Sequence, residues 1–226
     1  MTQSRPTGAA VAALVAAVAL AGGAAAQPAA AVERATDAAR AEAARLIAEA
    51  RAGDLFEDAS TGSVPGARHL RSGLVCSFEP GEQANRIFVL EESVAPRGDD
   101  VACATQVLGV TTLLYATRYP KPVSVREAVD DAIRGVAAQF PGAREYGGRT
   151  AKVDPSAPAA ANRERARVEV TIEGQPALAK IDVAEVNGWI IKLRATGPLE
   201  PPLATDLFAE VAFAAVLDQM GGSGPR

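Results

Sequence analysis

The chain has few of the side chains that most metal and catalytic sites need. It contains one histidine, one tryptophan and two cysteines, and aromatic residues make up only 4% of it. One histidine excludes any site that needs two, and two cysteines exclude both a four-cysteine zinc site and a disulfide-dense scaffold. Basic residues are not in excess either, with 23 Lys and Arg against 27 Asp and Glu and a net charge of -4. We therefore expect no nucleic-acid partner.

Alanine is abundant instead, most of all near the N-terminus, where residues 1–26 predict a secretory signal peptide. Arg5 precedes an apolar run from Gly8 to Ala21, and Ala24 and Ala26 form an A-x-A cleavage site. An uncleaved membrane anchor is the alternative, but this run of about 14 residues is shorter than the roughly 20 that span a membrane. No later segment is long and apolar enough to span. We expect a periplasmic or secreted protein.

The rest of the chain divides into a helix, one domain and a tail. Residues 27–53 predict an Ala-rich, charged helix, because alanine favours helices and Gly53 ends this one. We expect its last turn to dock on the domain; a partner-binding helix is the alternative. Residues 54–220 predict a single α+β domain that starts with a loop at 54–71. Residues 221–226 are expected to be a disordered tail.

Strand and helix patterns alternate along this domain. Ser124 and Glu127 form a capping box that begins a helix extending to Phe140, and Leu203–Met220 predicts a final helix. Alternating or short apolar segments predict strands at 73–78, 86–93, 101–107, 110–119, 145–153, 165–173, 177–185 and 189–196. Short connections between neighbouring strands favour antiparallel pairing. The predicted fold is therefore an antiparallel sheet of about six or seven strands with helices packed on it.

This order of elements resembles the layout of PsbP-type folds, with helices on one or both faces of an antiparallel sheet. A cystatin- or NTF2-like curved sheet is the alternative. The resemblance concerns the order of elements, and it implies no function for this chain.

Cys76 and Cys103 are predicted to form a disulfide, since an isolated pair usually joins in an oxidising compartment. If the strand at 86–93 lay between them, the two cysteine strands would be about 9.6 Å apart. A disulfide needs its Cα atoms within about 7 Å. The bond therefore requires the two strands to be direct neighbours or to meet at a sheet end.

Asn187 and Gly188 predict the turn of a C-terminal hairpin. A two-residue turn would mix apolar and charged residues on both faces of the sheet, which a half-buried sheet resists. We therefore predict a three-residue loop at 186–188. Its register pairs Glu185 with Trp189, Val183 with Ile191, and Ile181 with Leu193. Trp189, Ile191 and Leu193 would then lie in the core beneath a helix.

The sequence offers no catalytic, cofactor-binding or metal-ligating residue. It has no nucleophile elbow or glycine-rich phosphate loop, and His69 is predicted on a polar surface loop between arginines. Arg163, Arg165 and Arg167 share one face of a strand at period two. They are either solvated charges on an edge strand or a face that binds an anionic ligand or lipid head group. A further candidate, for the rim of a pocket, is the cluster Tyr115, Arg118 and Tyr119.

Two classes of function remain. The lack of a catalytic constellation favours a non-catalytic exported domain that binds a ligand, a partner protein or an envelope component. The alternative is a small periplasmic hydrolase with a site assembled from scattered polar residues. A pocket with several convergent polar groups of shifted pKa would favour the hydrolase, and a smooth sheet covered by helices would favour the binding domain.

Overall fold

The described residues form three helices and ten strands. The structure, a computed structural model, describes residues 26–90, 95–150, 162–201 and 204–221. The predicted signal peptide up to residue 25 and residues 222–226 of the predicted tail lie outside these ranges. The helices are α1 (Ala26–Glu49), α2 (Val125–Gln139) and α3 (Ala204–Gly221). The strands are β1 (Phe56–Asp58), β2 (Gly66–His69), β3 (Val75–Ser77), β4 (Arg86–Val89), β5 (Asp100–Val107), β6 (Val110–Thr117), β7 (Arg144–Glu145), β8 (Arg163–Ile172), β9 (Gln175–Val186) and β10 (Trp189–Pro198).

The strands form two antiparallel sheets. The large sheet has seven strands in the order β4-β5-β6-β10-β9-β8-β7, and the small sheet has the order β1-β2-β3. This architecture confirms the predicted α+β fold with an N-terminal helix. The prediction of a loop at 54–71 was wrong, because β1 and β2 lie there. These strands have only three and four residues, too few to show an alternating pattern.

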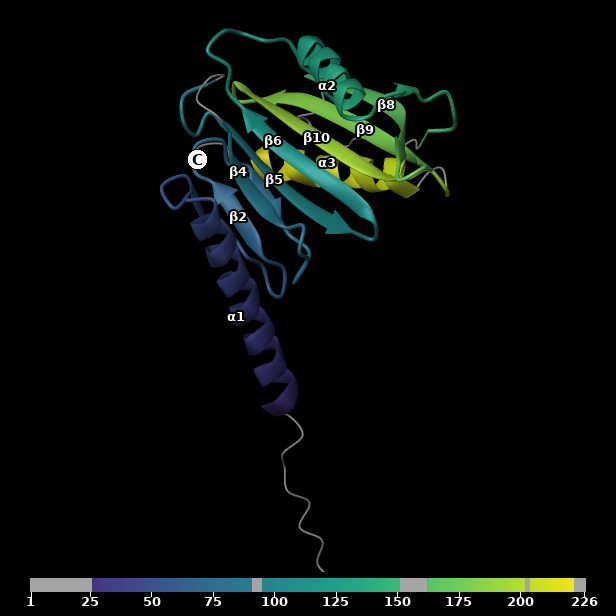
Figure 1. The fold of residues 1–226 in the computed structure, drawn as a ribbon. Helices are drawn as coiled ribbons and strands as arrows, with labels where there is room; N and C mark the ends of the chain where they lie inside the picture. The colour runs from purple at the N-terminus through teal and green to yellow at the C-terminus, as the bar shows by residue number, and fades with distance from the viewer. Residues whose placement is uncertain (1–25, 91–94, 151–161, 202–203, 222–226) are drawn as a thin grey trace, which may run out of the picture.

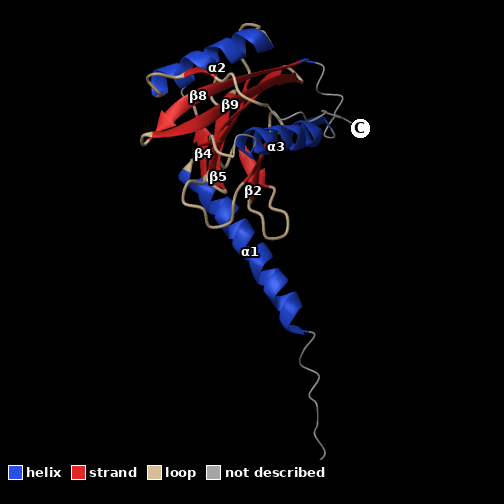
Figure 2. Cartoon of the chain, turned by 90° about the vertical axis from the view of Figure 1, so that its right-hand side faces the viewer, coloured by secondary structure: helices blue, strands red, loops and turns tan. Residues whose placement is uncertain are grey.

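Helices cover both faces of the large sheet, as Figure 2 shows, with α2 on one side and α3 on the other. The predicted capping box begins α2: the Glu127 amide donates to the Ser124 hydroxyl, and the Ser124 amide donates to the Glu127 carboxylate. Under α2 the core consists of apolar residues from β8, β9 and β10, among them Val168 and Ile181. On the other face, Phe213 of α3 packs in a core that includes residues of the small sheet.

The register of the C-terminal hairpin corrects the prediction. Trp189 pairs with Val186 around a two-residue turn, and Leu193 pairs with Asp182. Asn187 and Gly188 both have positive φ angles, of 52° and 78°, as a tight hairpin turn requires. The prediction failed because it assumed that only one face is buried, whereas the hairpin strands bury residues on both faces, such as Ile190 and Ile191. Trp189, Ile191 and Leu193 do lie in the core that α3 covers, as predicted.

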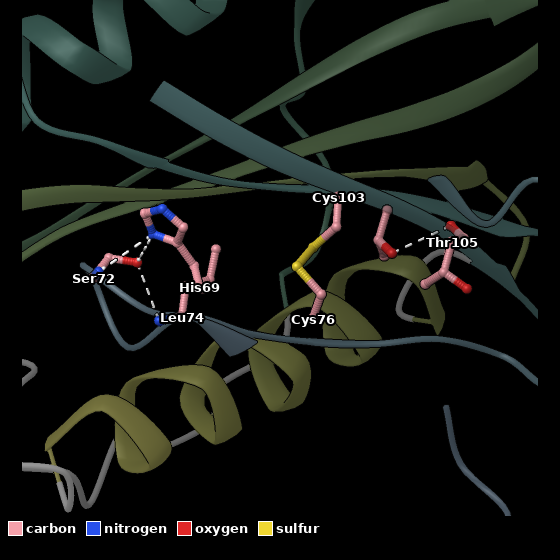
Figure 3. Close-up of a disulfide and its surroundings, with 7 residues drawn as sticks. His69, Ser72, Leu74, Cys76, Cys103 and Thr105 are labelled. Atoms are coloured by element: carbon pink, nitrogen blue, oxygen red, sulfur yellow. Dashed lines mark hydrogen bonds between the residues drawn. A yellow bond between two sulfur atoms is a disulfide. The ribbon is translucent and has the colours of Figure 1, made fainter. Parts of the chain in front are cut away.

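The predicted disulfide between Cys76 and Cys103 is confirmed, with Cα atoms 6.1 Å apart (Figure 3). Its geometry differs from both arrangements that we expected. Cys76 lies on β3 of the small sheet and Cys103 on β5 of the large sheet. The bond therefore ties one sheet to the other across the core and does not join neighbouring strands of one sheet.

Helix α1 projects from the domain, and its N-terminal end points away from both sheets (Figure 1). Its second half docks through a buried stripe of Ala39, Ala43, Leu46 and Ile47 against β1, β2 and β4. The contact is longer than the predicted single turn. Within the described ranges, no helix combines the length and apolarity that a membrane crossing needs.

Candidate functional site

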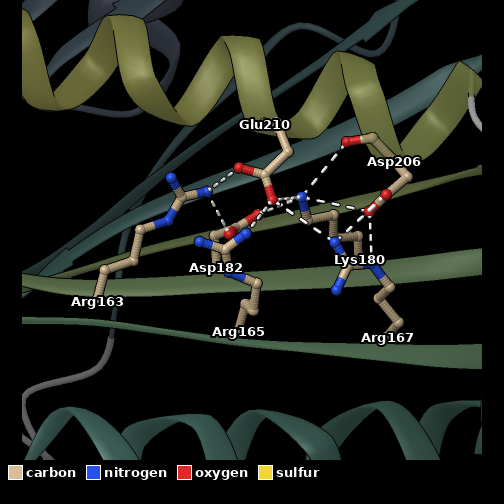
Figure 4. Close-up of polar contacts among 7 residues, drawn as sticks. All are labelled: Arg163, Arg165, Arg167, Lys180, Asp182, Asp206 and Glu210. Atoms are coloured by element: carbon tan, nitrogen blue, oxygen red, sulfur yellow. Dashed lines mark hydrogen bonds and ion pairs between the residues drawn. The ribbon is translucent and has the colours of Figure 1, made fainter. Parts of the chain in front are cut away.

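The predicted arginine face lies in a buried ionic network between the large sheet and α3 (Figure 4). We define the ionic network as the side chains of Arg163, Arg165, Arg167, Lys180, Asp182, Asp206 and Glu210. Strand β8 supplies the arginines, β9 supplies Lys180 and Asp182, and α3 supplies Asp206 and Glu210. Residues at alternate positions of β8 and β9 point to the same face, so the strands place these groups beneath the helix.

Each arginine of the ionic network meets an internal carboxylate. Arg163 Nη2 lies 2.6 Å from Asp182 Oδ1 and 2.7 Å from Glu210 Oε2. Arg165 Nη1 lies 3.0 Å from Glu210 Oε1, and Arg167 Nε lies 2.6 Å from Asp206 Oδ1. The alternative of solvated edge charges was wrong for Arg163, whose side chain is only 2% exposed. The anion-binding face stays a prediction, although these guanidiniums already have counter-ions.

The buried carboxylates have perturbed acidity. Burial raises the pKa of Asp182, although Lys180 and Arg163 act against it. Burial would also raise the pKa of Glu210, but the hydrogen bond and charge of Lys180, together with Arg163 and Arg165, lower it. Lys180 contacts Glu210 and lies 3.3 Å from Asp206 Oδ1. Each charged group of the ionic network thus has an opposite charge nearby, although Arg163 Nε and Asp182 Oδ2 have no hydrogen-bond partner. This internal pairing indicates a structural role.

His69 corrects another prediction, because it is buried on β2 and is not part of a surface loop. Its Nδ1 lies 2.8 Å from the Ser72 hydroxyl, as Figure 3 shows, and its ring packs between Phe56 and Trp189. Burial, with the nearby charge of Arg71, lowers its pKa to about 4. A histidine and a serine at this distance resemble a nucleophile pair. Ser72 is buried too, however, so this pair packs the core and a substrate does not reach it.

A groove lies on the other face of the large sheet, over β5, β6 and β10. Helix α2 packs on β8 and β9 and leaves these strands largely uncovered (Figure 1). The groove has a volume of about 900 Å³. It is lined by side chains from several strands and the turns at their ends, among them Gln106, Thr111, Leu113, Ile172, Pro176, Arg194 and Leu199. We call it the open-face groove.

Among the described residues, Arg194 is the only basic one that lines the open-face groove, whose lining also includes the acidic residues Glu173 and Glu200. Its side chain is half-buried, and Nε has no hydrogen-bond partner. No carboxylate of the described residues lies within 4.0 Å of its guanidinium. The position is set by the hairpin register, which pairs Arg194 with Leu113 of β6 and Ile181 of β9. Water or an external anion can therefore reach the guanidinium of Arg194.

Lys192 is the second cation of this face, two positions before Arg194 on β10. Its Nζ lies 4.4 Å from the centre of the Tyr115 ring. Burial lowers the pKa of Lys192, and the charges of Asp100 and Asp131 offset this only partly. Burial also raises the pKa of Asp100 and of Tyr115. These three groups of perturbed acidity lie on the open face, but none of them lines the open-face groove.

The predicted cluster of Tyr115, Arg118 and Tyr119 is divided by the sheet. Tyr115 faces Lys192 on the open face. Arg118 instead lies over the ring of Trp189, 5.3 Å from its centre, and pairs with Asp99. Sequence reasoning missed Lys192 and Arg194. A signal was present, since these two basic residues alternate with Ile191 and Leu193 and must share a face.

Comparisons with known proteins leave the function open. No family model and no curated protein matches the chain. Among solved structures, it is similar to the crystal structure of LpqN, which is involved in cell envelope biogenesis of Mycobacterium tuberculosis. The identity is 14%, the match covers 61% of this chain and 76% of that chain, and the TM-score is 0.31. A likeness this remote carries no argument about function.

Proposed function

We propose that the protein is an exported, non-catalytic binding domain whose ligand carries an anionic group on an apolar body and occupies the open-face groove. One observation carries this proposal: Arg194 lines the groove and is half-buried, and no carboxylate of the described residues lies within 4.0 Å of its guanidinium, although Glu173 and Glu200 also line the groove. Removing a guanidinium from water is costly unless a partner compensates it. An anionic ligand supplies that partner.

The walls of the open-face groove support the apolar part of this ligand. Leu113, Ile172, Pro176 and Leu199 give the groove apolar wall surface, and its polar residues include Glu173 and Glu200 as well as Arg194. Pockets for small molecules usually have volumes of about 300–1,000 Å³, are mostly apolar and contain a few polar groups that orient the ligand. The open-face groove, at about 900 Å³, agrees with this description.

Export is supported by the cysteines and by the predicted signal peptide. Both cysteines are joined in one disulfide, and disulfides persist mainly in oxidising compartments such as the periplasm or the extracellular space. The N-terminal pattern at 1–26 lies outside the described residues. A periplasmic or secreted location therefore belongs to the proposal.

Fluorescence titration with anilinonaphthalene sulfonate tests the binding site, because this probe joins a sulfonate to an apolar ring system. We expect saturable binding of one molecule, weakened about tenfold or more in Arg194→Gln, which corresponds to losing about 1.4 kcal/mol. Arg126→Gln is the matched control, since Arg126 lies on α2 outside the groove and pairs with Asp130. The neutral analogue phenylnaphthylamine should bind equally to both variants. Equal affinity of the wild type and Arg194→Gln for the sulfonate would overturn the proposal.

A hydrolase remains the second candidate because burial shifts the pKa values of Asp100 and Lys192 on the open face, although neither residue lines the groove. Asp100 is engaged, however, since the Thr117 hydroxyl donates to it at 2.7 Å. Among the described residues that line the open-face groove there is no serine, cysteine or histidine. Turnover of an ester substrate that disappears in Asp100→Asn and Lys192→Met, with both variants folded, would favour the hydrolase.

A further inference from the structure

A second pocket lies on the opposite face of the large sheet, beside the disulfide. It has a volume of about 240 Å³ and is enclosed by β3, β5, β6 and α3. Its lining includes Val75, Phe78, Cys103, Leu114, Leu193, Phe208, Ala212 and Val216. We call it the disulfide pocket. Leu114 and Leu193 pair with each other on the α3 face, whereas Leu113 and Arg194 pair on the open face, so the sheet separates the two sites.

The walls of the disulfide pocket are mostly apolar, and their polar residues are Thr105, Thr112 and the exposed Ser77 and Gln219. The Thr112 hydroxyl donates to the Thr105 carbonyl at 3.3 Å. The Thr105 hydroxyl donates to Asn85 Oδ1 at 2.7 Å and accepts from the Glu79 amide at 3.0 Å. Both threonine hydroxyls are therefore engaged within the protein. A ligand inside the pocket must be apolar, because a buried polar group without a hydrogen bond is unfavourable.

The size and opening of the disulfide pocket restrict its occupant further. An apolar cavity of about 150 Å³ stays dry and binds benzene, so one of about 240 Å³ has room for a longer apolar group. It is smaller than the volume of about 300–1,000 Å³ that drug-sized ligands occupy. Ala215 and Gln219 are exposed on its α3 side, so one end of a bound molecule can remain in water. The adjoining β5–β6 turn carries Leu108, whose side chain is 93% exposed.

We infer that the disulfide pocket binds the alkyl chain of an amphiphile, with the polar head in water beside Ala215 and Gln219. The disulfide holds the pocket together. Cys103 forms part of its wall, and Cys76 lies between the wall residues Val75 and Ser77 on the facing sheet. This site does not depend on Arg194, so the inference is independent of the proposed function.

An NMR titration with octyl glucoside, below its critical micelle concentration, tests the inference with a neutral head group. We expect saturable amide shifts in β3, β5 and α3. Ala212→Phe fills the pocket and should weaken binding at least tenfold. Val211→Phe is the matched control, because Val211 lies on the same helix, is already exposed and does not line the pocket. Arg194→Gln should leave octyl glucoside binding unchanged.

A second pocket variant and reduction of the disulfide provide two further tests of binding in the disulfide pocket. If Ala212→Phe does not fold, Ala215→Trp at the exposed rim should still weaken binding by a similar factor. Reducing the disulfide in the folded protein should also lower the affinity, because β3 is then no longer tied to β5. Shifts confined to the open-face groove, or binding that neither pocket variant weakens, would overturn the inference.

Discussion

The two charged regions of the molecule lie on opposite faces of one sheet and differ in their counter-ions. In the ionic network, three arginines and Lys180 meet three carboxylates within the protein. On the open face, Lys192 and Arg194 are half-buried, and the described residues place no carboxylate in ion-pair contact with them. The three arginines of β8 therefore have counter-ions within the protein, whereas the two basic residues of β10 have no ion pair among the described residues.

The helices cause this difference. Asp206 and Glu210 are four residues apart, so they share one face of α3 and reach the sheet together. The acidic residues of α2 are used differently: Asp130 and Asp131 pair with Arg126 and Arg134 on the helix itself. The carboxylates of α3 point toward the sheet and pair with the arginines of β8. Asp130 and Asp131 of α2 form ion pairs with arginines of the same helix.

The largest expected effect comes from breaking the ionic network. Glu210→Ala leaves Lys180, Arg163 and Arg165 without their shared carboxylate, and removing one partner of a buried ion pair costs about 3–5 kcal/mol. Urea denaturation should show this loss in the free energy of unfolding. Asp218→Ala, an exposed position on the same helix, is the control and should change stability by less than about 0.5 kcal/mol. A loss below about 1 kcal/mol for Glu210→Ala would mean that the network contributes little.

An intermediate effect on stability is expected at His69. No carboxylate of the described residues lies within 4.0 Å of its ring, so this residue tests the effect of burial without an ion pair. Its folded pKa of about 4 lies below the unfolded value of 6.5, so the unfolded state binds the proton more readily. The stabilisation is complete above pH 6.5 and is lost as pH falls toward 4. Between pH 7.5 and pH 5.5 the free energy of unfolding should decrease by roughly 1 kcal/mol.

The measurement at His69 has a clean control. The chain contains no other histidine, so His69→Gln should remove most of the change in stability between these two pH values. If His69→Gln kept the full pH dependence of stability, another titrating group would be its cause.

The smallest effect on stability is expected at Arg194. Arg194→Gln removes a cation that has no internal partner, so the free energy of unfolding should change by less than about 0.5 kcal/mol. Urea denaturation in low salt measures this change, and the same variant should lose affinity for the sulfonate probe. If Arg194→Gln destabilised the domain by more than about 1.5 kcal/mol, Arg194 would belong with the ionic network, and the contrast between the two faces would fail.

Much of the fold could be predicted because its signals are local. The capping box at Ser124 and Glu127 begins α2 as expected, and alternation identifies most of the strands of the large sheet. The strands that escaped prediction, β1 and β2, are too short to show a period. The candidate site was harder, because it depends on which helix covers which strand, and no local pattern records that.

The sequence by itself determined the class of fold, the helix boundaries near their caps and the partnership of Cys76 with Cys103. Only the tertiary structure decided the hairpin register, the burial of His69 and the separation of paired from unpaired cations. The physical reason is the same in each case. Hydrophobic alternation identifies a buried face when the other face meets water, but here β9 and β10 bury residues on both faces, and buried charges are stabilised by partners distant in sequence.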